Sequence, residues 1–334
     1  MPKARNVGSV MSNTFQRRSA RAALGAVAVV ATVALLGGTV RTLPLLIDPN
    51  IPTSAAWLFA RAVAVLALEV AIGLGWPVGW SLALATLVER GEARAYQTLG
   101  TSPAELAGKL SLQGLAIAAV LFGVSWSAAL DAERPGRVLA DLVVASRSAC
   151  ESEGALAARA IPIPFLSAHW LCSPGVPPRL YMPLPRPEGA LATATSLYVS
   201  PDVRSVRLTG ANVEMGRASL KVGELELKRL PPLVASATIG PLGRAASISA
   251  ATLVASWGVA WLVLNLAIDR RLWAISLAGT AGLAGFGALR GLDRLGVGDR
   301  PWLLGLVPVA TLTALALGAL LVVGLRRIRA TATS

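Results

Sequence analysis

Charged residues are scarce in this sequence. Asp, Glu, Lys and Arg together make up 15% of the chain, whereas they supply about a quarter of an average soluble domain. Hydrophobic residues make up 54%. This balance predicts a membrane protein and argues against a soluble globular enzyme.

Residues that build catalytic and metal sites are equally rare. The chain has one histidine, His169, and two cysteines. A lone histidine disfavours a Ser-His-Asp hydrolase, and His169 with the nearby Cys172 supplies too few ligands for a metal. HExxH, GxSxG and CxxC patterns do not occur, and Gly108-Lys109 lacks the upstream glycine of a phosphate-binding loop. We therefore expect no catalytic residue, metal or cofactor.

Acidic residues are fewer than basic ones, which gives a formal net charge of +13. The basic residues cluster at the ends of apolar runs instead of forming a separate basic domain. Such placement is typical of membrane topology signals and contacts with lipid headgroups. We expect no nucleic-acid partner.

Long apolar runs divide the chain into three parts. A run of about 20 apolar residues is long enough to cross a bilayer, and six candidates occur, at residues 22–40, 55–88, 110–130, 246–268, 272–289 and 301–325. The first run is longer than the core of a signal peptide, so we expect it to be a span that is not cleaved. Residues 1–130 then hold three spans, residues 131–245 an inserted domain and residues 246–334 three more spans. The positive-inside rule puts both termini in the cytoplasm and the inserted domain on the opposite side.

The inserted segment has the patterning of β-strands. Short alternations of apolar and polar residues between Gly and Pro predict antiparallel strands, hence an all-β sandwich or jelly roll. The alternations cover residues 179–182, 190–199, 203–208 and 218–230. No strand is predicted in residues 131–178.

Both cysteines, Cys150 and Cys172, lie in this inserted segment. Two cysteines confined to a domain outside the cytoplasm predict a disulfide. Two unpaired thiols in the core remain the alternative.

One acidic residue, Glu69, stands inside an apolar run. An ionisable residue within a span is a candidate functional group. The alternative is a structural ion pair with Arg61, two helical turns away.

A charged island of about twenty residues, 89–109, separates the second and third apolar runs. Gly100 is suited to end a helix because it accepts a positive φ, and Ser102, Pro103 and Glu105 form the pattern of a capping box that starts another. Short helices placed between two spans could push on a partner protein. An ordinary solvated connector is the plainer interpretation.

Within this island, Glu92, Gly100 and Ser102 have the spacing found in the lipopolysaccharide-export permease family (LptF/LptG type, YjgP/YjgQ-like), which the chain resembles. The resemblance extends to the order of three spans, a β domain and three spans. It implies a periplasmic jelly roll and a coupling helix that docks on a cytoplasmic ABC ATPase. The implied coupling residues are Glu92, Arg94, Gly100, Ser102 and Glu105.

A second match lies around the loop after the first span. Arg41, Asp48 and residues 51–53 resemble the family's segment that helps to hold the phosphorylated head of the lipid, which makes Arg41 the implied lipid-binding residue. Residues 298–302, with Pro308 beyond, also resemble the family. The family usually carries several basic residues near the end of its first span, and only Arg41 occurs here, which leaves the cargo open.

The resemblance thus implies a non-catalytic permease subunit in a bacterial inner membrane. Its implied partners are the ABC ATPase, a second homologous permease subunit, a periplasmic bridge protein and lipopolysaccharide or a similar anionic lipid. Two alternatives remain: an ABC permease subunit for another lipid or a lipoprotein, and a membrane scaffold or sensor that transports nothing.

Overall fold

The computed structural model describes residues 7–47, 53–130, 134–153, 158–163, 168–183, 191–200, 205–215, 218–227, 239–296 and 300–332. The chain forms two compact units. We call residues 1–37, 65–129 and 238–334 the helical unit, and residues 38–64 and 130–237 the β unit. Each unit is described by itself.

Within the described residues, six helices are long and apolar enough to cross a membrane, as the sequence predicts. They are α1 (Val7–Ile47), α2 (Thr53–Glu89), α5 (Ser111–Leu130), α7 (Pro241–Asn265), α8 (Arg271–Arg294) and α9 (Leu306–Ala332). Two short helices, α3 (Glu92–Thr98) and α4 (Pro103–Gly108), connect α2 with α5, and a 3-10 turn, η2 (Pro301–Gly305), precedes α9. The chain therefore forms a polytopic helical membrane protein with an inserted β unit.

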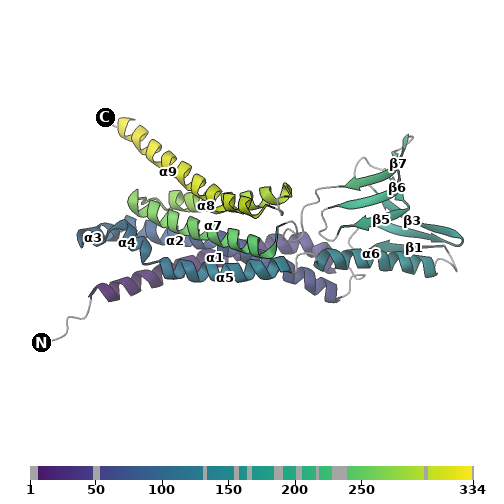
Figure 1. The fold of residues 1–334 in the computed structure, drawn as a ribbon, viewed down its shortest axis with the longest axis horizontal. Helices are drawn as coiled ribbons and strands as arrows, with labels where there is room; N and C mark the ends of the chain where they lie inside the picture. The colour runs from purple at the N-terminus through teal and green to yellow at the C-terminus, as the bar shows by residue number, and fades with distance from the viewer. Residues whose placement is uncertain are drawn as a thin grey trace. The chain divides into compact units, whose positions relative to one another are not determined.

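Small residues allow the helices of the helical unit to approach closely. Helices α7, α8 and α9 pack against one another (Figure 1). A Cβ added at Gly285 on α8 would lie 2.8 Å from the Thr311 hydroxyl on α9. On α2, a Cβ at Gly75 would lie 2.6 Å from the Cα of Val27 on α1, and one at Gly79 would lie 2.7 Å from the Ala22 carbonyl oxygen. Side chains larger than hydrogen at these positions would separate the helices.

The described strands of the β unit form one antiparallel sheet (Figure 1). They are β1 (Arg159–Ile163), β2 (Ala168–Ser173), β3 (Val176–Pro183), β4 (Leu191–Ala194), β5 (Ser196–Val199), β6 (Val206–Met215) and β7 (Ala218–Leu227). Strands β4 and β5 lie end to end along β6, because β4 pairs with residues 212–214 and β5 with residues 206–209. Counted as one broken strand, they give a meander in which each strand pairs with the next.

Helix α6 (Arg134–Glu153) packs on this sheet and completes its core. Leu139 and Val143 of α6 are buried with Trp170 of β2 and Leu180 of β3. In β2 buried and exposed residues alternate, with Ala168, Trp170 and Cys172 facing inward. The period of two follows from the pleat of a strand with one buried face.

The predicted antiparallel strands are confirmed, but two details of the predicted domain are wrong. Among the described residues the strands form a single curled meander and not a jelly roll. With β4 and β5 counted as one broken strand, every pairing joins strands that follow one another in the chain. The unit is also not all-β. Residues 131–178, for which no strand was predicted, supply α6, β1, β2 and the start of β3.

Candidate functional site

The connector between α2 and α5 folds as the local sequence predicts. Gly91 has φ +74° and turns the chain from α2 into α3. Gly100 has φ +87°, and past the end of α3 the amide of Thr101 donates to the carbonyl of Tyr96 at 3.0 Å. A residue with a side chain would be strained at either glycine.

The predicted capping box at the start of α4 is confirmed. The Glu105 amide donates to the Ser102 hydroxyl at 3.2 Å, and the Ser102 amide donates to the Glu105 carboxylate at 3.0 Å. Pro103 occupies the first helical position, where no amide hydrogen is needed. Ser102 and Glu105 are thus brought together in a structural role.

One face of the connector is buried and the other is exposed. Ala93 of α3 and Leu106 of α4 are buried in the same cluster as Leu264 of α7. On the opposite side Arg94 is exposed, and Leu99 is 72% exposed. Leu99 directly follows α3, so the connector leaves an apolar side chain exposed at the end of an anchored helix.

Polar contacts also tie the connector to the N-terminal part of α1. The Gln16 side chain donates to the carbonyl of Lys109 at 2.8 Å, and Gln113 donates to the carbonyl of Gln16 at 3.0 Å. Arg18 forms an ion pair with Glu92 at 3.5 Å. Displacement of the connector would therefore act on α1 as well as on α2 and α5.

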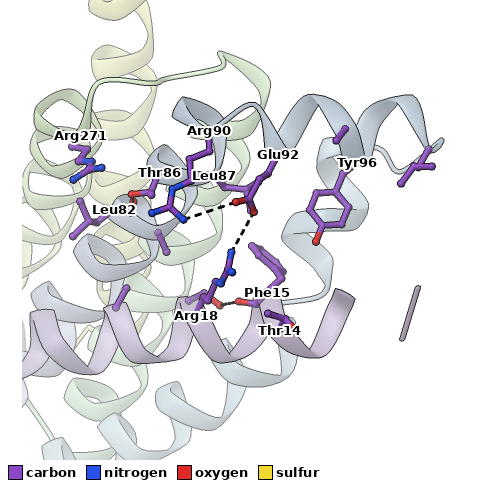
Figure 2. Close-up of a pocket in the computed structure, with 15 residues that line it drawn as sticks. Thr14, Phe15, Arg18, Leu82, Thr86, Leu87, Arg90, Glu92, Tyr96 and Arg271 are labelled. Carbon is purple, nitrogen blue, oxygen red and sulfur yellow. Dashed lines mark hydrogen bonds and ion pairs between the residues drawn. The ribbon is translucent and has the colours of Figure 1, made fainter. Parts of the chain in front are cut away.

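Glu92 lies between two arginines. Besides Arg18, the Arg90 guanidinium lies 4.0 Å from its carboxylate (Figure 2). Nearby, Arg271 at the start of α8 donates to Glu89 from Nε at 3.0 Å and from Nη2 at 2.9 Å. All these side chains are at least one third exposed, so solvent weakens each pair.

A cavity of about 670 Å³ opens beside this cluster (Figure 2). Four elements line it: the start of α1, the end of α2, α3 and the first residue of α8. Its lining residues include Phe15, Arg18, Leu82, Leu87, Arg90, Glu92, Tyr96 and Arg271. The volume lies in the usual range for small-molecule sites.

A second polar cluster lies inside the helical unit, and of its members the sequence indicates only Glu69. Glu69 on α2 is fully buried, and its carboxylate accepts hydrogen bonds from Arg244 Nη2 on α7 at 2.6 and 2.8 Å and from the Ser125 hydroxyl on α5 at 2.8 Å. From the sequence, the structural alternative for Glu69 is an ion pair with Arg61, whereas its partner in the structure is Arg244. No local signal links positions 69 and 244, because the pair forms only when α2 and α7 pack.

The residues implied in lipid binding are only partly described. Arg41 lies in α1, but its side chain lies outside the described residues, as do Asp48 and residues 51–52. Thr53 begins α2. Of residues 298–302, the first two also lie outside the described part, whereas Arg300 directly precedes η2.

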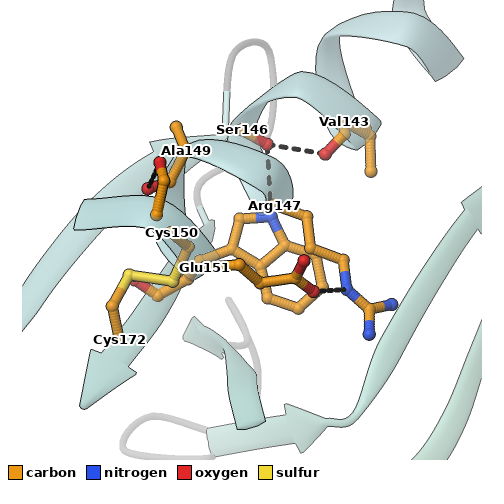
Figure 3. Close-up of a disulfide and its surroundings, with 9 residues drawn as sticks. Val143, Ser146, Arg147, Ala149, Cys150, Glu151 and Cys172 are labelled. Atoms are coloured by element: carbon orange, nitrogen blue, oxygen red, sulfur yellow. Dashed lines mark hydrogen bonds and ion pairs between the residues drawn. A yellow bond between two sulfur atoms is a disulfide. The ribbon is translucent and has the colours of Figure 1, made fainter. Parts of the chain in front are cut away.

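The two cysteines meet in the β unit. Cys150 of α6 and Cys172 of β2 form a disulfide with their Cα atoms 5.4 Å apart (Figure 3). The adjacent Trp170 ring nitrogen donates to the Ser146 hydroxyl at 3.2 Å, and the Arg147 guanidinium lies 5.8 Å from the centre of that ring. The disulfide and these contacts fix α6 on the sheet.

No group of three or more His, Cys, Asp and Glu side chains suited to a metal ion occurs in the described part of the chain. Comparison with models of known protein families gave no match, and comparison with curated proteins also gave none. The fold by itself defines a class, a membrane protein with six candidate spans and a curled antiparallel β unit.

Proposed function

We propose that this chain is the membrane-spanning permease subunit of an ABC exporter that lifts lipopolysaccharide, or a similar anionic lipid, out of a bacterial inner membrane. In this proposal both termini are cytoplasmic and the β unit is periplasmic. ATP hydrolysis takes place in a separate ATPase subunit, and a second homologous permease completes the transport path.

The observation that carries the proposal is the form of the connector between α2 and α5. A simple loop would need neither two capped helices nor a buried anchoring face. Ala93 and Leu106 fix the connector to the helical unit, while Arg94 and Leu99 face outward. Such a connector can receive a push from an ATPase and pass it to three spans.

The β unit supports the proposed periplasmic location. A disulfide between Cys150 and Cys172 would persist in an oxidising compartment and be reduced in the cytoplasm. In the proposed cycle the β unit receives the lipid and passes it towards a periplasmic bridge protein. An exporter needs such a path because exposing acyl chains to water costs about 0.8 kcal/mol per CH₂ group.

The first test is affinity purification of the full chain from native membranes in mild detergent, with identification of what co-purifies. An ABC ATPase together with a second six-span subunit is the expected result. A chain that emerges alone, or with envelope structural proteins, would contradict the proposal and favour a scaffold or sensor. Recovery of the ATPase with a lipoprotein or another lipid would favour an ABC subunit with a different cargo.

The second test locates the surface at which the ATPase would contact the chain. Because both cysteines are held in the disulfide, an introduced cysteine provides a unique thiol. Leu99→Cys should crosslink to the ATPase, whereas Leu295→Cys should not, although Leu295, at the end of α8, is equally exposed (77% against 72%). Crosslinking of both variants, or of Leu295→Cys alone, would contradict the proposed docking surface.

A further inference from the structure

The cavity beside the connector has a charged end and an apolar end. The charged Arg18 and Arg90 and the apolar Ala22, Leu82 and Ala83 all line the cavity. Along α2, Leu82 lies eight residues before Arg90, about 12 Å at the rise of an α-helix. Along α1, Ala22 lies one turn after Arg18 and so further into the candidate span at residues 14–40. The cavity thus leads from the end of the spans into their apolar part.

The charged end holds more positive than negative charge. Three guanidinium groups, those of Arg18, Arg90 and Arg271, line the cavity together with the carboxylate of Glu92. Glu89 neutralises Arg271 through two short hydrogen bonds. Arg18 and Arg90 both pair with Glu92, at nitrogen–oxygen distances of 3.5 and 4.0 Å. Three positive and two negative side chains leave a net charge of +1, which one further anionic group would balance.

Guanidinium groups suit a particular anion. Their planar fork of N–H donors matches two oxygens of a phosphate, and such charge-assisted pairs are stronger than neutral hydrogen bonds. Tyr96 also lines the cavity. Figure 2 shows Arg18 and Arg90 directed to Glu92 from different elements, as a pair that converges on one anion.

We propose that this cavity binds the phosphate headgroup of an anionic membrane lipid, with the phosphate on Arg18 and Arg90 and the start of an acyl chain along Ala22, Leu82 and Ala83. A free phosphate would match only the charged end. The apolar wall favours an amphiphile, and the ends of the spans are where a bilayer presents its headgroups. The site is independent of the lipid cargo of the proposed exporter and requires only that the six helices lie in a bilayer.

A bound phosphate would also compete with Glu92 for the two arginines. Glu92 would then lose its contact with α1.

The test measures binding of short-chain phosphatidylglycerol to the purified full chain in neutral detergent, with phosphatidylcholine of the same chain length and inorganic phosphate as comparison ligands. Tight binding of phosphatidylglycerol and weak binding of the other two is expected. Equal affinity for inorganic phosphate would overturn the lipid assignment in favour of a free phosphate site. Equal affinity for phosphatidylcholine would overturn the role of the net charge.

Variants locate the site. Arg18→Gln with Arg90→Gln should weaken phosphatidylglycerol binding about tenfold or more, because two hydrogen bonds to a charged group are lost. Both side chains are well exposed, so the fold should persist. Arg17→Gln, the adjacent exposed arginine outside the cavity lining, is the matched control and should bind normally. Unchanged binding in the double variant, or an equal loss in the control, would overturn the proposal.

A third variant tests the apolar wall without changing charge. Ala83→Leu should narrow the cavity and weaken phosphatidylglycerol binding severalfold, while leaving the weak binding of inorganic phosphate unchanged. Unaltered lipid binding in this variant would show that no acyl chain lies there and would overturn that part of the proposal.

Discussion

Glu69 on α2 and Arg244 on α7 form a buried ion pair across 175 positions of sequence, with nitrogen–oxygen distances of 2.6 and 2.8 Å. The pair joins a helix from before the β unit to a helix that follows it. Ser125 on α5 donates a third hydrogen bond to the same carboxylate. Three helices are thereby fixed in one register.

Glu69→Gln should destabilise the helical unit by about 3 to 5 kcal/mol, because it leaves the Arg244 guanidinium buried without its counter-charge. Unfolding of the full chain in detergent, followed by heat or denaturant, measures the loss. The combined variant Glu69→Leu with Arg244→Met removes both charges and should recover most of the stability. A double variant as unstable as the single one would contradict this account.

Gly79→Ala should separate α1 from α2, because the new Cβ would lie 2.7 Å from the Ala22 carbonyl oxygen. We expect a loss of about 1 to 3 kcal/mol, as for other overpacked contacts. Gly123→Ala on α5 is the control, since no atom of the described chain lies within 4 Å of its added Cβ. Replacing glycine by alanine within a helix should there be neutral or stabilising by up to about 1 kcal/mol. Equal melting temperatures for the two variants would disprove the close approach.

Cys150→Ser with Cys172→Ser should destabilise the β unit by about 3 kcal/mol, the usual value for a closed loop of this length. The cysteines are 22 positions apart. Hydrogen exchange of α6 and β2 should rise. Adding a reductant should reproduce this change in the native chain and have no effect on the variant. A reductant that changes neither protein would show that the bond is not formed in solution.

Glu92→Lys should impair recovery of the ATPase with the chain, since it reverses the charge on the proposed docking surface and adds a third cation beside Arg18 and Arg90. The chain should still reach the membrane. Arg18→Gln separates the two roles of Glu92, because it removes the ion pair with α1 and keeps the carboxylate. If Arg18→Gln lowered ATPase recovery as much as Glu92→Lys, the internal pair and not docking would be responsible.

Arg41→Glu should reduce photo-crosslinking of the chain to a phosphorylated cargo lipid, because a carboxylate repels the phosphate that an arginine attracts. The control is Arg294→Glu, an exposed arginine near the end of α8 outside the resemblance. Normal crosslinking of Arg41→Glu would count against the proposed cargo site. An equal decrease in the control would indicate a general effect of charge.

Signals confined to a few turns of chain were enough to predict part of this protein. Six spans follow from apolar length, because each helix must satisfy its own backbone hydrogen bonds inside a bilayer. The turn at Gly100 and the cap formed by Ser102 and Glu105 follow from contacts at most five residues apart. The period of two predicted the strands from residue 179 onwards, where alternation is regular. The two cysteines indicated a disulfide only together with the predicted location of their domain.

Only the tertiary structure decided the rest, because it depends on residues distant in sequence. The partner of Glu69 is Arg244 and not the nearby Arg61, since helix packing decides which side chains meet. Alternation does not encode the long-range pairing that decides strand order. Only the structure therefore shows that the sheet is a meander covered by α6. The cavity beside Glu92 arises where α1, α2, α3 and α8 converge. Local sequence determines which elements form, whereas the burial of their apolar faces against one another determines which charges they bring together.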